Sequence, residues 1–211
     1  MPGQFITFEG GEGTGKSSHA RDLAESLRKS GRSVVLTREP GGSPGAEDVR
    51  ALLVTGTVGR WSVTAETLLN YAARETHLRE TIRPALARGD LVLCDRFMDS
   101  TRAYQGFAGG GDMELIETLE RKIVGTTRPH LTLILDVDPE LGLKRAKGRG
   151  GAGAEDRFEK KGLEFHRKLR EGYLEIAGGD PERCRVIDSS RPYAAVAEDI
   201  RRLIAPIAGV P

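Results

Sequence analysis

The chain has 211 residues, of which 38% are hydrophobic, and its 32 Lys and Arg against 31 Asp and Glu give a net charge of +1. This composition excludes an intrinsically disordered chain, and the balanced charge gives no reason to expect a nucleic-acid or membrane partner. We expect one folded domain over residues 1–211, because single hydrophobic cores commonly serve chains of this size.

The number of cysteines and the lengths of the apolar runs indicate the cellular compartment of the protein. Two cysteines, Cys94 and Cys184, are too few for a disulfide framework. Apolar runs fall short of the roughly 18 residues that a membrane helix needs, and the first residues lack the apolar length of a signal peptide. We therefore expect a cytoplasmic protein.

Strand and helix patterns alternate along the chain. Short runs rich in Val, Ile and Leu predict buried strands at residues 5–8, 33–37, 91–94, 131–137 and 185–187. Helical periodicity predicts helices at about residues 15–30, 64–88, 112–124, 139–147, 162–177 and 192–207. Such alternation favours parallel strands joined by right-handed crossovers, so we predict a three-layer α/β fold with a parallel five-stranded sheet, of undetermined strand order, flanked by helices.

A phosphate-binding motif follows the first strand and precedes the first helix. Residues 10–17 match G-x-x-x-x-G-K-[ST]. Their position between a buried strand and a helix is the context that this motif has in a P-loop NTPase fold. The glycines let backbone N–H groups converge on phosphate oxygens, Lys16 reaches the β and γ phosphates, and Ser17 holds Mg²⁺. The predicted ATP-binding residues of this segment are Gly10, Gly11, Glu12, Gly13, Thr14, Gly15, Lys16, Ser17 and Ser18.

The third predicted strand ends in a charged pair, Asp95 and Arg96. A carboxylate at the carboxyl end of a buried strand lies on the sheet edge where α/β proteins bind ligands. Asp95 is therefore a candidate for the Mg²⁺ shell or for orienting an acceptor phosphate, with a helix cap or a surface ion pair as the alternative. Arg96 beside it could bind phosphate oxygens bidentately.

A glycine-rich segment follows the predicted fourth helix. Residues 148–155 include four glycines, so we expect a mobile loop there, forming a lid over about residues 148–157. Arg149 and Arg157 lie in this lid. Arginines elsewhere follow the second strand, end the third and lie in the long helix; positive charge at several loci suits transfer of a phosphoryl group between two anions.

The chain resembles thymidylate kinases essentially from end to end. The stretches that carry the resemblance are Phe8-Glu-Gly-Gly-Glu-Gly-Thr-Gly-Lys-Ser-Ser, Thr37-Arg-Glu-Pro-Gly-Gly, Tyr71-Ala-Ala-Arg-Glu-Thr-His, Asp95-Arg-Phe, Ser100-Thr-Arg-Ala-Tyr-Gln-Gly, Leu135-Asp-Val-Asp-Pro-Glu-Leu-Gly-Leu-Lys-Arg and Asp156-Arg-Phe-Glu. The resemblance implies transfer of the γ-phosphoryl group of Mg²⁺-ATP to dTMP, giving dTDP and ADP for dTTP synthesis. It also implies a homodimer.

Roles on the acceptor side follow from the resemblance, position by position. Glu12 would lie near the sugar and acceptor phosphate, Arg38 and Arg96 would bind that phosphate, and Arg74 would hydrogen-bond thymine O4. Tyr104 would pack against the sugar. The dTMP-binding residues predicted from the resemblance, with neighbours of the matching positions included, are Arg38, Glu39, Pro40, Asn70, Tyr71, Arg74, Arg96, Ser100, Thr101, Tyr104 and Gln105.

The resemblance also implies which residues act at the transferred group. The phosphate loop has no arginine, as in family members that supply this cation from the lid. Arg149 would then stabilise the transferred phosphoryl group, with Arg157 assisting or substituting, and Arg145 would stack on adenine. The implied catalytic set is Lys16, Asp95, Arg96, Arg149 and Glu12, with Ser17 and Asp95 as metal ligands.

One position departs from the family pattern. Many relatives have a phenylalanine four residues before the helix arginine, where this chain has Asn70 followed by Tyr71. Successive helical residues point about 100° apart, so Tyr71 cannot simply replace that side chain. Which of the two contacts thymine stays open at this point.

Two other functions compete with this interpretation. A deoxynucleoside kinase of the same fold would take a neutral 5′-hydroxyl as acceptor, whereas Arg38, Arg74 and Arg96 suggest a charged one. A regulatory nucleotide-binding module without catalysis is the second alternative. The intact Lys16, Ser17 and Asp95 argue against it.

Overall fold

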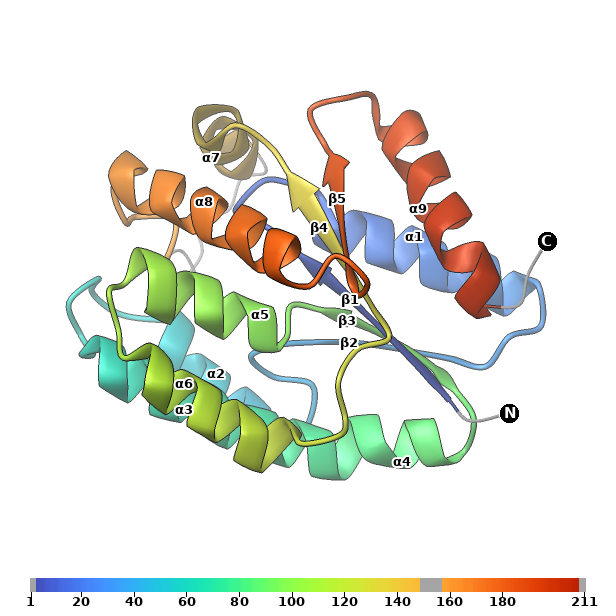
Figure 1. Cartoon of the computed structure of the whole chain (residues 1–211), viewed down its shortest axis with the longest axis horizontal. Helices are drawn as coiled ribbons and strands as arrows, with labels where there is room; N and C mark the ends of the chain where they lie inside the picture. Colours follow the sequence, from blue (N-terminus) through green and yellow to red (C-terminus); the bar gives the residue numbers. More distant parts are fainter. Residues whose placement is uncertain (1–2, 149–156, 209–211) are drawn as a thin grey trace.

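A computed structural model describes residues 3–148 and 157–208 of the chain. Its centre is a five-stranded sheet in the order β2-β3-β1-β4-β5, in which all neighbouring strands are parallel (Figure 1). The strands are β1 (Gln4–Glu9), β2 (Val34–Arg38), β3 (Leu91–Asp95), β4 (Leu131–Asp136) and β5 (Cys184–Asp188). The carboxyl ends of β1 and β3 are therefore adjacent, and the chain leaves both strands toward one edge of the sheet.

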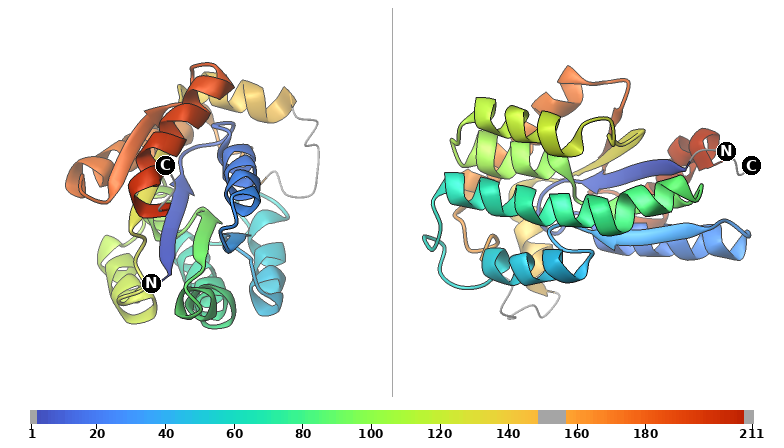
Figure 2. Two further views of the ribbon diagram at one scale, coloured as in Figure 1. Left: turned by 90° about the vertical axis from the view of Figure 1, so that its right-hand side faces the viewer. Right: turned by 90° about the horizontal axis from the view of Figure 1, so that it is seen from below.

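Helices cover both faces of this sheet (Figures 1 and 2). The α-helices are α1 (Lys16–Lys29), α2 (Pro44–Val54), α3 (Val63–His77), α4 (Arg83–Ala87), α5 (Met98–Thr101), α6 (Met113–Leu119), α7 (Pro139–Gly148), α8 (Leu163–Gly179) and α9 (Tyr193–Ala208). Three π-helical turns, η1 (Leu78–Ile82), η2 (Arg102–Ala108) and η3 (Glu120–Val124), continue α3, α5 and α6 respectively.

Alternation along β1 divides the core between the two faces. Ile6 and Phe8 pack with α1 and α9, whereas Phe5 packs with α3, α4 and α6 on the other face. Successive side chains of a strand point to opposite faces, so Thr7 and Glu9 lie on the same face as Phe5. Polar residues thus occupy the end of β1 on the face that α5 and α8 cover.

The structure confirms the predicted strands and the parallel α/β sheet. The predicted helix at residues 64–88 exists as α3, η1 and α4, with Pro84 in the first turn of α4. Proline lacks the N–H that a regular helix would use, and the π-helical turn before it accommodates the missing donor. Across the described residues, none of the helices has both the length and the apolar character to cross a membrane.

Two helical segments, α2 and α5 with η2, were not among the predicted helices. The buried positions of α5 and η2 include Asp99, Thr101 and Gln105, so this segment has no apolar stripe to reveal it. Its hydrophobic periodicity is replaced by polar side chains that serve the site described below.

Packing of α8 against η2 depends on one glycine. A Cβ atom at Gly172 would lie 2.6 Å from Phe107 Cβ, whereas one at Gly178, in the last turn of the same helix, would meet nothing within 4 Å. We predict that Gly172→Ala lowers the free energy of unfolding by about 1–3 kcal/mol through overpacking. Gly178→Ala, the matched control, should leave stability unchanged or raise it by up to about 1 kcal/mol. Thermal unfolding measures both; equal Tm values for the two variants would contradict the predicted packing.

Candidate active site

The phosphate loop connects β1 to α1 at the sheet edge. Gly10, Gly13 and Gly15 adopt positive φ values of 130°, 69° and 90°. A Cβ atom at Gly13 would lie 1.9 Å from the carbonyl oxygen of Gly142 in α7, so only glycine fits there. Gly15 is the residue before the first turn of α1, which leaves the free N–H groups of this helix end facing the loop.

Lys16 folds back over this loop. Its Nζ donates to the carbonyl oxygen of Gly11 at 2.6 Å and to Thr14 Oγ1 at 3.2 Å. Burial and the nearby Arg96 lower the pKa of Lys16 to about 8, although Glu12 and Asp95 oppose the shift. A bound phosphate would supply the counter-charge that favours the protonated lysine.

Ser17 and Asp95 meet beside the loop, as their predicted role in metal binding requires. Ser17 Oγ donates to Asp95 Oδ2, while Asp95 Oδ1 is buried and has no hydrogen-bond partner. A hydroxyl and a carboxylate with an unused oxygen are ligands that suit Mg²⁺, which usually takes one or two protein oxygens and completes its shell with phosphate and water. Over the described part of the chain there is no cluster of three or more His, Cys, Asp or Glu side chains that could hold a metal by itself.

Arg96 is the centre of the site. It is the one non-glycine residue with a positive φ, 71°, in the described ranges. Its Nη1 donates to the carbonyl oxygen of Gly10 at 2.8 Å, and its Nη2 donates to Glu12 Oε1 at 3.0 Å. The guanidinium also lies over the ring of Tyr104, 4.9 Å from its centroid. Such backbone conformations cost energy and are found where function fixes a side chain.

Glu12 is ionised in this arrangement. Burial alone would raise the pKa of its carboxyl, but the charges of Arg96 and Lys16 and a 2.6 Å hydrogen bond from Tyr104 OH outweigh it and lower the pKa to about 2. Burial in turn raises the pKa of Tyr104 well above its usual value, so this phenol stays a donor. Glu12 therefore holds Arg96 and Tyr104 on one wall.

A cavity of about 150 Å³ opens on that wall. Its lining residues are Glu12, Glu39, Pro40, Arg50, Val54, Asn70, Arg96, Ser100, Thr101, Tyr104, Gln105, Phe158 and Glu159. A second cavity of about 240 Å³ lies over the phosphate loop and shares Glu12, Glu39, Arg50, Arg96 and Glu159 with the first. Arg38, which is exposed and donates to Glu47 at 3.2 Å, lines this second cavity. The two cavities adjoin at Arg96.

Arg74 lies beneath the first cavity rather than on its surface. Nε donates to Glu39 Oε2 at 2.8 Å, and Nη2 donates to Thr101 Oγ1 and to the carbonyl oxygen of Phe97, both at 3.0 Å. Nη1 is buried without a partner. An unpaired buried guanidinium nitrogen is costly, so this atom is a donor with unused hydrogen-bonding capacity.

Asn70 and Tyr71 are neighbours in sequence but lie in different surroundings. Asn70 lines the cavity, and its Nδ2 donates to the carbonyl oxygen of Glu66 at 2.8 Å. Tyr71 is 1% exposed, packs in the core and supports the Arg74 guanidinium, which lies 4.6 Å from its ring centroid. Its inclusion among the dTMP-binding residues is therefore corrected: the helical angle between neighbouring residues turns Tyr71 inward, below Arg74.

The structure also corrects the expectation for Arg157. This residue is 0% exposed, and its three guanidinium nitrogens donate to the carbonyl oxygens of Thr57, Leu53 and Val58 at 2.9–3.0 Å and to Glu66. Arg157 is thus an anchor for the loop between α2 and α3. A side chain with all three nitrogens engaged this way is not placed to assist at a phosphoryl group.

Two other lid-side arginines were predicted to act at ATP. Arg145 donates to the carbonyl oxygens of Ser189 at 2.8 Å and Ser190 at 3.2 Å, in the loop between β5 and α9. Its stacking on adenine stays a prediction. Arg149 lies outside the described residues, as do residues 149–156 of the lid that was expected at about residues 148–157.

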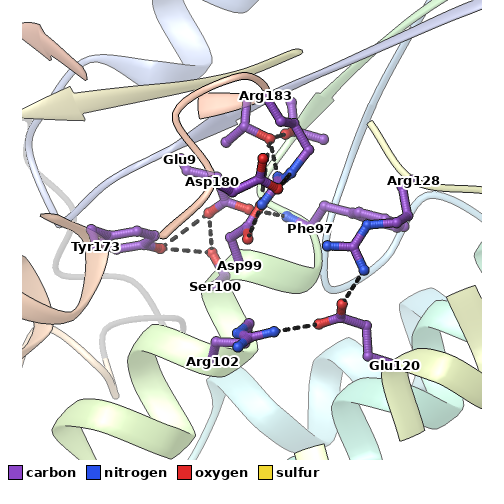
Figure 3. A network of polar contacts seen from close by, with 12 residues as sticks. Glu9, Phe97, Asp99, Ser100, Arg102, Glu120, Arg128, Tyr173, Asp180 and Arg183 are labelled. Atoms are coloured by element: carbon purple, nitrogen blue, oxygen red, sulfur yellow. Dashed lines mark hydrogen bonds and ion pairs between the residues drawn. The ribbon is translucent and has the colours of Figure 1, made fainter. Parts of the chain in front are cut away.

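Sequence reasoning missed three buried groups that support the cavity. Glu9 and Tyr173 form a polar cluster with Ser100 (Figure 3). Glu66 accepts from Gln105 Nε2 at 3.0 Å and so fixes the orientation of that amide. Glu9 could have been found, because it is a carboxylate at the carboxyl end of a buried strand, as Asp95 is. Glu66 and Tyr173 have no such signal.

The fold and the two adjoining cavities define a P-loop kinase of the nucleoside monophosphate kinase class. The family model described as thymidylate kinase matches residues 8–200. The thymidylate kinase of Caulobacter vibrioides is 55% identical over 208 residues, covering 99% of both chains. That of Ruegeria pomeroyi is 51% identical over 202 residues, covering 96% of this chain and 94% of the relative.

A solved structure agrees with these relatives. The crystal structure of thymidylate kinase from Ehrlichia chaffeensis has a TM-score of 0.77 to this chain at 34% identity, covering 97% of this chain and 99% of that one. The chain belongs to the thymidylate kinase family, and it is accordingly an ATP-dependent nucleoside monophosphate kinase.

Arg157→Met tests the placement of that side chain. Removing one partner of a buried ion pair typically costs about 3–5 kcal/mol, so we expect a Tm lower by roughly 10 °C. We expect kcat of the folded enzyme to stay within about tenfold of wild type, because Arg157 does not contact the phosphate loop. Arg167→Met, which breaks an exposed pair with Glu140, is the control and should change stability by less than about 1 kcal/mol. A collapse of kcat at unchanged Tm would refute the structural role.

Proposed function

We propose that this thymidylate kinase family member transfers the γ-phosphoryl group of Mg²⁺-ATP to dTMP. An oxygen of the dTMP phosphate attacks the γ-phosphorus, the bond from that phosphorus to the β–γ bridging oxygen breaks, and ADP and dTDP leave. The observation that carries the proposal is the junction of two cavities at Arg96, one over the phosphate loop and one beside it. Two anions bound there would lie side by side with a cation between them.

The donor side is assigned to the phosphate loop. Residues 10–18 would hold the ATP phosphates, with Lys16 on the β and γ groups and Arg145 on adenine. Ser17 and Asp95 would hold Mg²⁺, which neutralises phosphate charge when it is bound with ATP. The unpartnered Asp95 Oδ1 supports this assignment. We assign Arg149 to the transferred phosphoryl group.

The acceptor side is assigned to the smaller cavity. Arg96 and Arg38 would bind the dTMP phosphate, and Glu12 would keep Arg96 in place. Tyr104 would pack against the sugar and disfavour a 2′-hydroxyl, while Glu39 and Pro40 shape the phosphate end. Ser100 joins Arg96 and Tyr173 at this wall.

We assign the selection of the base to the hydrogen-bond donors and acceptors that Arg74 and Gln105 present. Arg74 Nη1 is a buried donor without a partner, which suits the O4 carbonyl of thymine. Gln105 commits its NH₂ group to the acceptor Glu66, so its carbonyl oxygen is the group it can offer to the N3–H of thymine. Cytosine presents the opposite polarity at both positions. Asn70 and Thr101 complete this end of the cavity.

Several properties of the whole protein belong to the same proposal. The activity would supply dTDP, and through it dTTP, for DNA replication in the cytoplasm. We propose a homodimer, with ATP and dTMP as the partners and with no nucleic-acid or membrane partner.

Acceptor choice is the test of this function. ADP release from Mg²⁺-ATP is measured with dTMP, dUMP, dCMP, AMP, GMP and thymidine offered separately. We expect turnover with dTMP to exceed that with dCMP by at least about tenfold, because two hydrogen bonds are reversed in polarity. Preference for thymidine would make the protein a nucleoside kinase, and no turnover with any acceptor would favour a binding module.

Lys16→Ala is the control for that assay. We expect loss of turnover by at least about a hundredfold at an unchanged circular dichroism spectrum, since the ammonium group acts on the transferred charge. Turnover at the wild-type rate would contradict the assignment of the phosphate loop.

A further inference from the structure

A buried carboxylate, Glu9, lies directly before the phosphate loop. It is 0% exposed and accepts three hydrogen bonds (Figure 3). Oε1 accepts from the backbone N–H of Phe97 at 2.7 Å, and Oε2 accepts from Ser100 Oγ at 2.6 Å and from Tyr173 OH at 3.1 Å. No ion pair to Glu9 is formed within residues 3–148 and 157–208, so its partners are neutral groups.

The same two hydroxyl groups face Arg96. Arg96 Nη1 donates to Tyr173 OH at 3.2 Å and lies 3.4 Å from Ser100 Oγ. Guanidinium nitrogens only donate, so each hydroxyl must turn a lone pair toward Arg96 and its hydrogen elsewhere. An ionised Glu9 only accepts hydrogen bonds, and Ser100 donates to it directly. Tyr173 OH donates either to Glu9 or to Ser100 Oγ, which lies 2.8 Å from it.

Protonation of Glu9 would reverse this order. Because Oε1 accepts from Phe97 N–H, the added proton would sit on Oε2 and donate to a hydroxyl. The hydroxyl that accepts this proton must turn its own hydrogen away from Oε2, either to the other hydroxyl 2.8 Å away or toward the Arg96 guanidinium, which is also a donor. Two donors facing each other in a buried site is an unfavourable arrangement.

We propose that ionised Glu9 is a positioning residue, which orients Ser100 and Tyr173 so that they hold the Arg96 guanidinium at the junction of the two cavities. The proposal rests on the proposed function, in which Arg96 binds the acceptor phosphate. Glu9 itself lines neither of the two cavities that adjoin at Arg96. Its effect on the reaction is therefore exerted through the hydroxyl pair.

The surroundings of Glu9 shift its ionisation toward neutral pH. Burial and the negative Asp99 raise its pKa to about 7, although Ser100, Arg96 and the Phe97 N–H favour the ionised form. The titratable and charged groups near it are Asp99, Arg96, Tyr173, Lys16, Arg74, Cys94 and Cys184. Above pH 7 the carboxylate accepts hydrogen bonds from both hydroxyls. Below pH 7 the fraction of molecules with protonated Glu9, and with it the unfavourable arrangement of donors, increases.

Glu9→Gln is the direct test, because a glutamine that accepts from Phe97 N–H must present its NH₂ group to the hydroxyls, as protonated glutamate would. We expect kcat/KM for dTMP at pH 8 to fall roughly tenfold to a hundredfold, the scale of a misplaced binding group, with KM for ATP unchanged. The wild-type to variant ratio should shrink toward pH 6, since the wild type then carries neutral Glu9. Titration of the dTMP phosphate cancels in this ratio.

Tyr173→Phe keeps the carboxylate and removes one hydroxyl, so it serves if Glu9→Gln does not fold. We expect a smaller fall in kcat/KM for dTMP, with KM for ATP unchanged. The proposal would be overturned if the folded variants had the kcat/KM of wild type for dTMP. It would also be overturned if the ratio of wild-type to Glu9→Gln kcat/KM stayed constant from pH 6 to 8. A variant with lowered Tm and equally raised KM for both substrates would also overturn it. Turnover of dTMP by the wild type stays as the separate test of the proposed function.

Discussion

One guanidinium, that of Arg96, connects the parts of this site. Parallel pairing of β1 with β3 brings Gly10 and Glu12 beside Arg96, and the positive φ of Arg96 turns its side chain toward them. The ion pair with Glu12 survives burial because the charges of Arg96 and Lys16 keep the carboxylate ionised. This contact holds the Arg96 guanidinium where the two cavities adjoin.

Buried charge elsewhere in the molecule is arranged to support that junction. Glu39 accepts a hydrogen bond from Arg74 and makes another with His77, and these contacts fix the Arg74 guanidinium under the smaller cavity. Glu66 is shared between Arg157 and Gln105, so a structural anchor and a cavity-lining amide depend on one carboxylate. Buried ion pairs contribute little net stability, but each becomes costly to break. Their consequence here is fixed geometry rather than a large gain in stability.

The sequence predicted the features that depend on local pattern. Buried strands and the phosphate loop were found because apolar runs and glycine spacing carry their own signal. Tyr71 and Arg157 were misjudged for a different reason, since closeness in sequence to Arg74 or to the lid does not say which way a side chain points or what buries it. Glu66 and Tyr173 act through contacts with residues far away in sequence, and no local pattern reveals such partners.

We propose that Arg96 and its neighbours form a site for a 5′-phosphate beside the phosphate loop. Calorimetric titration of the wild type and of Arg96→Met with dTMP and with thymidine, without ATP, measures it directly. Charge-assisted hydrogen bonds contribute about 1.5–3 kcal/mol each, so wild type should bind dTMP at least about tenfold more tightly than thymidine. Arg96→Met should largely abolish that preference, and equal affinity of the wild type for dTMP and thymidine would show that Arg96 does not bind the 5′-phosphate.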